Sequence, residues 1–221
     1  MSNDRILAVV FDMDGVLTDT EPIWDDVRRG LAREDGVPWP EDATDRMMGM
    51  STPEWADYLA TTVGVQGDAA QVAERAISRV TDRYREHLPL MPGAVAAVER
   101  TAGRWPVGLA SSSPRRLIDR VLEMTGLAKH FGATVSTEEV PAGKPEPDGY
   151  LRVCELLGVD PRRAVAVEDS SNGLRSAAAA GMHVVAVPHP AHPPAEDALA
   201  LADLTLDGLD ELTLDRVAAL G

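Results

Sequence analysis

The chain has 221 residues, a formal net charge of −15 and 44% hydrophobic residues, the composition of a folded globular protein. This charge disfavours nucleic acids and anionic membranes as partners, because no basic run reverses it locally. The single cysteine, Cys154, is expected as a buried helical thiol. With no apolar stretch of about 18 residues and no signal-peptide pattern, the sequence predicts a cytoplasmic protein, as a monomer or weak homodimer.

The predicted elements begin with an apolar strand at residues 6–11. The next strand starts only near Pro106, although an ordinary crossover between parallel strands needs about thirty residues, so a segment is inserted between them. The insert has helical periodicity, with Pro and Ser at helix starts and Gly at helix ends. Its predicted helices span residues 21–36, 51–64 and 68–88. We therefore predict a helical domain over 18–88, inserted into a core domain of residues 1–17 and 89–221.

Past the insert, short apolar runs alternate with helical patterns. The runs are near-continuously apolar, which is typical of strands covered on both faces of a sheet. Ser113 is the expected N-cap of one helix, with Pro114 at its first position and Gly126 at its end. A second helix is expected to start at Ser170 or Ser171. The repeated order predicts an α/β fold with a parallel sheet. The expected strands span residues 106–111, 133–137, 164–169 and 183–188.

Polar residues follow the carboxyl ends of these strands, where ligands bind in an open parallel sheet. Asp12 and Asp14 can face one site, because alternate positions of an extended segment point the same way. Carboxylates crowded in a low-dielectric crevice repel one another unless a cation binds, and all-oxygen ligands favour Mg²⁺. We therefore expect a magnesium site and an anionic substrate. The polar residues at the strand ends are Asp12, Asp14, Ser111, Lys144, Glu168 and Asp169.

The same region offers donors for a phosphate group. Ser111 and the backbone N–H groups of Ser112 and Ser113 lie just before a helix start, where amide donors and the helix dipole favour an anion. Lys144 is one of only two lysines, with Lys129, and adds a compact positive charge. The sequence therefore indicates a phosphorylated substrate.

Asp12 and Asp14 can supply the chemistry. A metal-bound Asp12 carboxylate can form an aspartyl phosphate, and Asp14 can protonate the leaving oxygen and later deprotonate water. Each residue also has a structural interpretation, since an Asp after a strand is often a turn residue. The joint occurrence of these residues at successive strand ends favours the functional interpretation. His189 and His192, in a proline-rich segment, are expected in a solvated loop rather than in a metal site.

Four segments together resemble the motifs of the haloacid-dehalogenase-superfamily phosphatases that carry a helical cap domain after the first strand. In chain order they read "DMDGVLTDTEP", "LASSS", "GKPEPDGYL" and "VEDSSNG", and the resemblance spans essentially the whole chain. It implies a Rossmann-like α/β core with a mobile, all-helical cap domain. It also implies these roles: Asp12 as nucleophile, Asp14 as general acid/base and metal ligand through its backbone carbonyl, Ser111 and Lys144 as phosphate ligands, and Glu168 with Asp169 completing the Mg²⁺ site.

Other residues separate the branches of this superfamily. Dehalogenases lack the second acid of the D-x-D pair, so Asp14 favours phosphoryl transfer. Phosphonoacetaldehyde hydrolases use a cap lysine as a Schiff base, and residues 18–88 contain no lysine. β-Phosphoglucomutase is the nearest alternative, but it has a histidine at the position of Trp24 and basic sugar-phosphate contacts at those of Met48 and Thr52. These departures favour a phosphatase that acts on sugar phosphates.

The sequence therefore predicts a Mg²⁺-dependent phosphatase of small phosphomonoesters, with sugar phosphates as the expected substrates. The alternatives are a β-phosphoglucomutase-type phosphosugar mutase and a non-catalytic protein that binds a phosphorylated metabolite. The intact acid and lysine set argues against the last. Trp24 fits the core of the helical cap equally well, and Arg115 and Arg116 also fit a solvated surface. The candidate substrate contacts are Ser111, Ser112, Lys144, Trp24, Gly49, Met50, Ser51 and Arg115.

Overall fold

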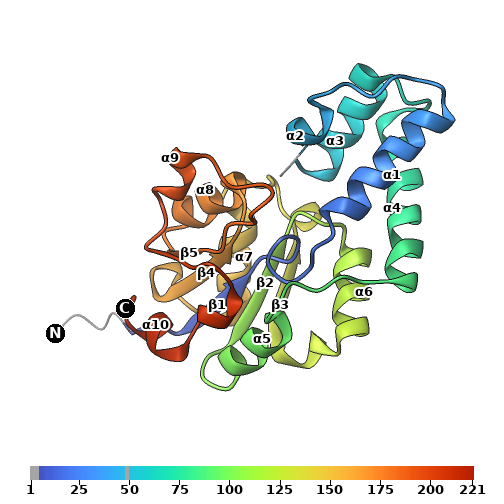
Figure 1. Ribbon diagram of the computed structural model, residues 1–221. Coiled ribbons are helices and arrows are strands. Elements are labelled where there is room, and N and C mark those ends of the chain that lie inside the picture. Colours follow the sequence, from blue (N-terminus) through green and yellow to red (C-terminus); the bar gives the residue numbers. More distant parts are fainter. Residues whose placement is uncertain (1–4, 48–49) are drawn as a thin grey trace. The chain divides into compact units, whose positions relative to one another are not determined.

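The computed structural model describes residues 5–47 and 50–221. The chain forms two compact units, one of Met1–Asp19 with Leu90–Gly221 and one of Thr20–Pro89 (Figure 1). The first is called the core unit and the second the helical unit below. Gly49, a predicted substrate contact, lies outside the described residues, as does Met48, which aligns with a basic contact of β-phosphoglucomutase.

The core unit is built on a six-stranded, all-parallel sheet with strand order β3-β2-β1-β4-β5-β6. Each residue of β1, β2 and β4 is buried, which confirms the expectation of strands covered on both faces. Val9 of β1 pairs with Val107 of β2 and with Val165 of β4, so the carboxyl ends of these three strands meet at one edge. The strands are β1 (Ala8–Phe11), β2 (Val107–Ser111), β3 (Phe131–Ser136), β4 (Ala164–Glu168), β5 (His183–Ala186) and β6 (Leu204–Thr205).

Helices flank this sheet (Figure 1). Tyr150, Val153 and Cys154 of one helix pack with Ala8 and Val10 of β1 in a buried apolar cluster, so Cys154 is the buried helical thiol that the sequence predicts. The helices of the core unit are α5 (Ala94–Ala102), α6 (Arg115–Thr125), α7 (Asp148–Leu157), α8 (Ser171–Ala179), α9 (Glu196–Leu199) and α10 (Leu214–Ala218), with short 3₁₀ turns at Leu127–His130, Thr137–Glu139, Pro161–Arg163 and Leu209–Glu211.

Two details of the core unit differ from the sequence prediction. The sequence prediction lacks the short edge strand β6, because two residues are too few for a periodicity signal. The helix expected to be capped by Ser113 instead begins at Arg115 with Pro114 as its N-cap. The Ser113 hydroxyl donates to Asp14 and is not the acceptor that caps the first turn of this helix. The predicted stop at Gly126 is confirmed, because this glycine adopts the left-handed conformation that closes α6.

The helical unit, inserted between β1 and β2, has its own apolar core. Val27 and Leu31 on one long helix face Val72, Ala76 and Val80 on another, and all five are buried. These helices are stabilised by local caps, such as Asp68, whose carboxylate accepts a hydrogen bond from the backbone N–H of residue 71 at 2.9 Å. The elements are α1 (Glu21–Glu34), α2 (Ala43–Met47), α3 (Thr52–Asp57), a π-helical turn η1 (Tyr58–Val63) and α4 (Ala69–Glu86).

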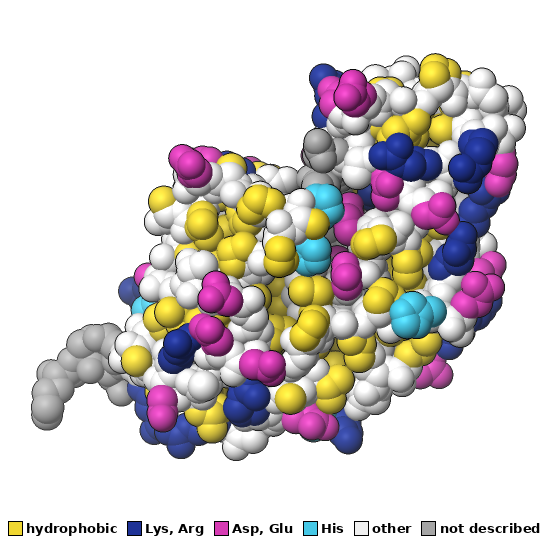
Figure 2. Space-filling view, viewed as in Figure 1, with side chains coloured by type: hydrophobic (Ala, Val, Ile, Leu, Met, Phe, Trp, Pro, Cys, Tyr) yellow, Lys and Arg dark blue, Asp and Glu magenta, His cyan; other side chains and the backbone are white. Residues whose placement is uncertain are grey.

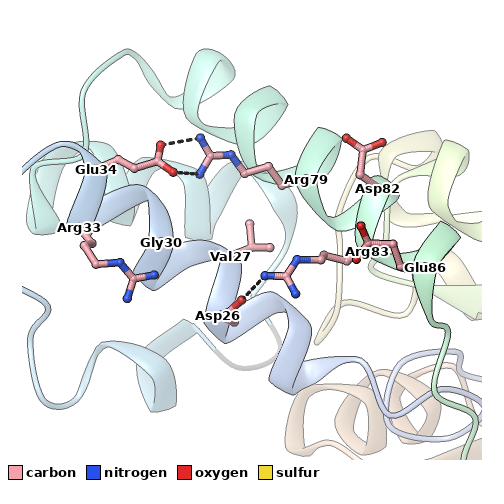
Figure 3. Close-up of a pocket in the computed structure, with 9 residues that line it drawn as sticks. All are labelled: Asp26, Val27, Gly30, Arg33, Glu34, Arg79, Asp82, Arg83 and Glu86. Carbon is pink, nitrogen blue, oxygen red and sulfur yellow. Dashed lines mark hydrogen bonds and ion pairs between the residues drawn. The ribbon is translucent and has the colours of Figure 1, made fainter.

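A groove of about 250 Å³ lies between α1 and α4 and is lined mainly by charged side chains (Figure 3). Arg79 donates to both carboxylate oxygens of Glu34, at 2.8 and 2.6 Å, and Arg83 pairs with Asp26 at 2.7 Å. Charged side chains that line the groove are therefore paired with one another across the two helices. On the face shown in Figure 2, the basic side chains are interspersed with acidic ones in the same way. Within the described residues, none of the helices is both long and apolar enough to cross a membrane.

Candidate active site

The candidate site lies at the edge of the sheet where β1, β2 and β4 end. Asp12 follows β1 directly, and its backbone N–H donates to the carbonyl of Val167 at 3.0 Å, which continues the pairing with β4. Glu168 is the last residue of β4, and Asp169 follows it. The parallel register thereby brings three carboxylates from two segments far apart in sequence to one place, as expected for an open parallel sheet.

Lys144 joins two of these carboxylates. Its ammonium donates to Oδ1 of Asp12 at 2.6 Å and to Oε1 of Glu168 at 2.5 Å, and the side chain is 6% exposed. Burial alone would lower the pKa of this lysine, but the two adjacent carboxylates raise it above its ordinary value. Lys144 therefore carries a fixed positive charge between the ends of β1 and β4.

Glu168 is fully buried and accepts several hydrogen bonds. The hydroxyl of Tyr150 donates to its Oε1 at 2.7 Å, while the backbone N–H of Asp169 and the hydroxyl of Ser170 donate to its Oε2 at 3.2 and 3.3 Å. Burial, followed by the charges of Glu168 and Asp12, raises the pKa of Tyr150 well above its ordinary value, so this phenol is a permanent donor. Sequence reasoning did not find Tyr150, because a tyrosine on an amphipathic helix carries no signal beyond that of a core residue.

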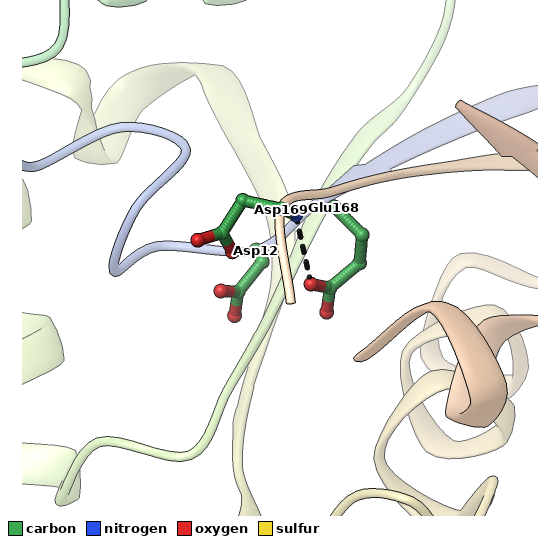
Figure 4. Close-up of side chains that lie close together, drawn as sticks. All are labelled: Asp12, Glu168 and Asp169. Carbon is green, nitrogen blue, oxygen red and sulfur yellow. Dashed lines mark hydrogen bonds between the residues drawn. The ribbon is translucent and has the colours of Figure 1, made fainter. Parts of the chain in front are cut away.

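Asp12, Glu168 and Asp169 form an acidic cluster in which one oxygen of each carboxylate lies within 4.8 Å of the others (Figure 4). Burial, together with the neighbouring acids, raises the pKa of Asp12 to about 7 and the pKa of Asp169 well above its ordinary value. Oδ1 of Asp169 is buried and has no hydrogen-bond partner among the described residues. A cation would satisfy this oxygen and reduce the repulsion, so the donor set fits a hard divalent ion.

Gly15 supports this cluster. It has a φ of 84°, and a Cβ atom at this position would lie 2.0 Å from Oδ2 of Asp169. A side chain there would be strained by the backbone and would displace the carboxylate. The glycine of the "DMDG" segment thus lets Asp169 approach the first strand.

Asp14 faces a cluster of hydroxyl groups. Ser113 donates to its Oδ2 at 2.7 Å, and the hydroxyls of Ser111 and Thr18 lie 3.5 Å from its carboxylate oxygens. The hydroxyl of Ser111 in turn accepts a hydrogen bond from the backbone N–H of Ser113 at 3.0 Å. Ser113, which the sequence suggested as a helix cap and amide donor, is thus the closest hydroxyl partner of Asp14. Ser112, a predicted substrate contact, is partly exposed beside them.

Arg115 does not present a free guanidinium. It donates to both oxygens of Glu139, at 3.1 and 2.5 Å, and to the hydroxyl and carbonyl of Thr134, at 2.8 and 2.9 Å. The hydrogen bonds to Glu139 and Asp119 raise the pKa of this arginine, although burial opposes them. Its donors tie α6 to β3, and we therefore do not retain Arg115 as a substrate contact.

The remaining predicted contacts belong to the helical unit. Trp24 is 5% exposed, its ring lies 5.6 Å from that of Trp55, and the guanidinium of Arg28 lies 4.9 Å from its ring centroid. Ser51 is the N-cap of α3, and its backbone N–H and hydroxyl both donate to Glu54, at 2.8 and 2.6 Å. Met50 is partly exposed. Trp24 and Ser51 thus have structural partners within the helical unit.

Comparisons with known proteins identify relatives of this chain. A family model described as haloacid dehalogenase-like hydrolase matches residues 6–181. Hexitol phosphatase B of Escherichia coli is 38% identical over 221 residues, which cover 96% of this chain and 97% of that protein. The phosphorylated carbohydrates phosphatase of Thermotoga maritima is 35% identical over 176 residues, which cover 79% of this chain and 82% of that protein. The crystal structure of β-phosphoglucomutase from Clostridium difficile has a TM-score of 0.82 at 23% identity, covering 97% and 96% of the two chains, a likeness that shows the shared fold.

Proposed function

Because this chain belongs to the haloacid dehalogenase-like hydrolase family, we propose that it is a Mg²⁺-dependent phosphatase of small phosphomonoesters, with sugar and hexitol phosphates as substrates. The observation that carries the proposal is the position of Lys144, whose ammonium lies between Asp12 and Glu168 beside the acidic cluster. A buried positive charge next to a buried carboxylate can hold a phosphoryl group against that carboxylate. The names of the two relatives support sugar phosphates as the substrate class.

In the proposed reaction, the Asp12 carboxylate attacks the phosphorus atom, and the bond from phosphorus to the sugar oxygen breaks as the aspartyl phosphate forms. Asp14 donates its proton to the leaving sugar oxygen. Water then attacks the same phosphorus and gives a proton to Asp14, and the bond from phosphorus to the Asp12 oxygen breaks, which restores both aspartates and releases inorganic phosphate. The hydrogen bond from Ser113 fixes the Asp14 carboxylate for both proton transfers.

The phosphoryl oxygens need donors throughout this cycle. We propose that Lys144 supplies the positive charge and that the Ser111 hydroxyl and the backbone N–H groups around Ser112 supply hydrogen bonds ahead of α6. Because Lys144 is held by two carboxylates, its position is set before the substrate arrives. This preorganisation is the main way in which a protein accelerates phosphoryl transfer.

The acidic cluster is the proposed metal site. Asp12, Asp169 and the backbone carbonyl of Asp14 would hold Mg²⁺, with Glu168 beside them, and the buried Oδ1 of Asp169 supports this assignment. When bound, the ion supplies charge neutralisation for the phosphoryl oxygens and the carboxylates. Selection of the substrate by Trp24, Met50, Ser51 and Gly49 stays a prediction, as do the cytoplasmic location, the oligomeric state and the domain boundaries.

A phosphosugar mutase is the second candidate, favoured by the likeness of the fold to β-phosphoglucomutase. A mutase must hold a second phosphate while it excludes water. Incubation of the purified protein with Mg²⁺ and a panel of hexitol and hexose phosphates separates the two, with both free phosphate and isomerised sugar measured. The phosphatase proposal expects stoichiometric phosphate release. Isomerised sugar without phosphate release would contradict it.

A further inference from the structure

Glu168 is confined by the start of α8. A Cβ atom built on Gly173 would lie 2.0 Å from the carboxyl carbon and from both carboxylate oxygens of Glu168, so the carboxylate rests directly against the glycine backbone. Gly173 lies in the first turn of α8 at an ordinary helical φ, so the left-handed conformation is not the reason for a glycine here. The absent side chain makes room for the Glu168 carboxylate.

The hydroxyl of Tyr150 holds the carboxylate from α7. Tyr150 is fully buried, and its hydroxyl donates to the same Oε1 of Glu168 that accepts the Lys144 ammonium. That ammonium also lies 5.3 Å from the centre of the Tyr150 ring. Tyr150 therefore contacts both partners of the Lys144–Glu168 ion pair, although it does not reach the acid proposed as nucleophile.

We propose that Gly173 and Tyr150 are positioning residues for phosphate binding. The absence of a side chain at Gly173 leaves space for the Glu168 carboxylate, and the Tyr150 hydroxyl fixes its orientation. Glu168 then shares the Lys144 ammonium with Asp12, so that the ammonium is not paired with Asp12 alone. The inference rests on the proposed function, because it assigns Lys144 to the phosphoryl group.

A side chain at Gly173 cannot be accommodated by a small movement of Glu168. The carboxylate accepts hydrogen bonds from Lys144, Tyr150 and Ser170 in its present position, and a displacement large enough to clear a methyl group breaks these bonds. The Lys144 ammonium then keeps Asp12 as its only near carboxylate partner in this group. Phosphate must then compete with Asp12 for the Lys144 ammonium, so the affinity of the enzyme for phosphate falls.

The test uses two pairs of variants. Gly173→Ala is matched by Gly149→Ala, because Gly149 is also a buried glycine in the first turn of a helix, but nothing lies within 4 Å of a Cβ atom built there. Tyr150→Phe is matched by Tyr84→Phe, which removes a hydroxyl from another fully buried tyrosine, in the helical unit.

The readouts are kcat, KM, the inhibition constant of inorganic phosphate, and phosphate binding by calorimetry without turnover. For Gly173→Ala we expect KM and the phosphate dissociation constant to rise about tenfold, and for Tyr150→Phe about threefold to tenfold, the net contribution of a typical hydrogen bond. The two control variants should stay within about twofold of the wild type. A purely structural role would lower the melting temperature and leave the phosphate affinity of the folded protein unchanged.

Phosphate binding within about twofold of the wild type in a folded Gly173→Ala protein would overturn the inference. If that variant does not fold, unchanged phosphate binding in Tyr150→Phe would overturn it instead. Failure of the proposed function looks different, because the wild type itself would then release no phosphate from any substrate of the panel. Weakened phosphate binding in both site variants, with unchanged controls, supports the inference whichever substrate the enzyme prefers.

Discussion

At the residue scale, the Lys144 ammonium is the fixed charge that lets Asp12 and Glu168 lie buried side by side. The Asp12 side chain is 8% exposed and the Glu168 side chain is fully buried. Removing one partner of such a group leaves uncompensated charge in a poorly solvated place, which costs far more than the loss of one surface ion pair. Lys144 therefore stabilises the fold as well as the proposed transition state.

We expect Lys144→Met to lower kcat/KM at least about a hundredfold, as for the loss of a main donor to a reacting oxyanion. The variant should also lose about 3–5 kcal/mol of unfolding free energy in the absence of divalent metal. Urea denaturation with and without Mg²⁺ measures the second effect. Unchanged stability in metal-free buffer would show that the carboxylates are not compensated by this lysine.

Gly15 gives a second prediction at this scale. Gly15→Ala should weaken Mg²⁺ binding at least about tenfold, because the new Cβ atom displaces the Asp169 carboxylate. Gly126→Ala is the control, since Gly126 also has a positive φ, of 67°, but nothing lies within 4 Å of its Cβ position. Both variants lose about 1 kcal/mol to backbone strain, whereas only the first should change Mg²⁺ affinity in calorimetry. Equal affinities in the two variants would contradict this account.

At the element scale, α1 and α4 are joined by ion pairs as well as by their apolar faces. Arg75 donates to both oxygens of Asp35 at 3.0 Å, and the backbone N–H of Gln66 donates to the same carboxylate at 2.8 Å. The Asp35 side chain is 10% exposed, which distinguishes this pair from the exposed pairs along the groove. The hydrogen bond from Arg75 holds the pKa of Asp35 below its ordinary value.

This shift predicts a pH dependence of stability. Because the folded state lowers the Asp35 pKa, its stabilising contribution is complete above the ordinary aspartate pKa of about 4 and is lost as the pH falls through the lowered value. Asp35→Asn should cost about 1 kcal/mol near neutral pH, and the difference from the wild type should shrink as the pH falls below the ordinary aspartate pKa of about 4. Urea unfolding across this range measures it. A pH-independent difference would contradict the ion-pair explanation.

The matched control for that experiment is Asp82→Asn. Asp82 pairs with Arg85 on the same helix, with side chains 64% and 58% exposed, and such surface pairs contribute little. We expect a change within about 0.5 kcal/mol at every pH.

Elements with clear periodicity or clear end signals could be predicted from the sequence, and others could not. Continuous apolar runs located β1, β2, β4 and β5, and Gly126 marked the end of α6 because its left-handed conformation favours glycine. The sequence signal for a serine cap places the start of α6 one residue too early, because it does not show that the Ser113 hydroxyl bonds Asp14, in the loop after β1. The start of α6 therefore depends on a tertiary contact, the hydrogen bond between Ser113 and Asp14.

At the scale of the whole molecule, topology explains why much of the candidate site could be predicted. Residues that follow parallel strands must meet at one edge, so the sequence alone groups Asp12, Lys144, Glu168 and Asp169. Tyr150 could not, because its contact with Glu168 depends on how α7 packs on the sheet. The same limit applies to Arg115, whose partners Glu139 and Thr134 become its neighbours only in the fold.

Metal binding should stabilise the whole protein. An ion that binds only the folded state adds about 2.7 kcal/mol when its concentration is a hundred times its dissociation constant. We expect Mg²⁺ to raise the melting temperature of the wild type and EDTA to abolish both this shift and the phosphatase activity. In Asp169→Asn the shift should be lost, since the buried unpartnered oxygen belongs to this residue. A full shift in this variant would place the metal elsewhere.

The central claim is that Asp12 becomes phosphorylated during turnover. The most direct test quenches the enzyme in acid during steady hydrolysis of a hexitol phosphate, reduces it with borohydride, and analyses the peptides by mass spectrometry. An aspartyl phosphate is reduced by this treatment, so the account predicts homoserine at position 12 in the wild type only when substrate is present, and inactivity of Asp12→Asn. Rapid phosphate release with residue 12 unmodified, together with full activity of Asp12→Asn, would contradict it.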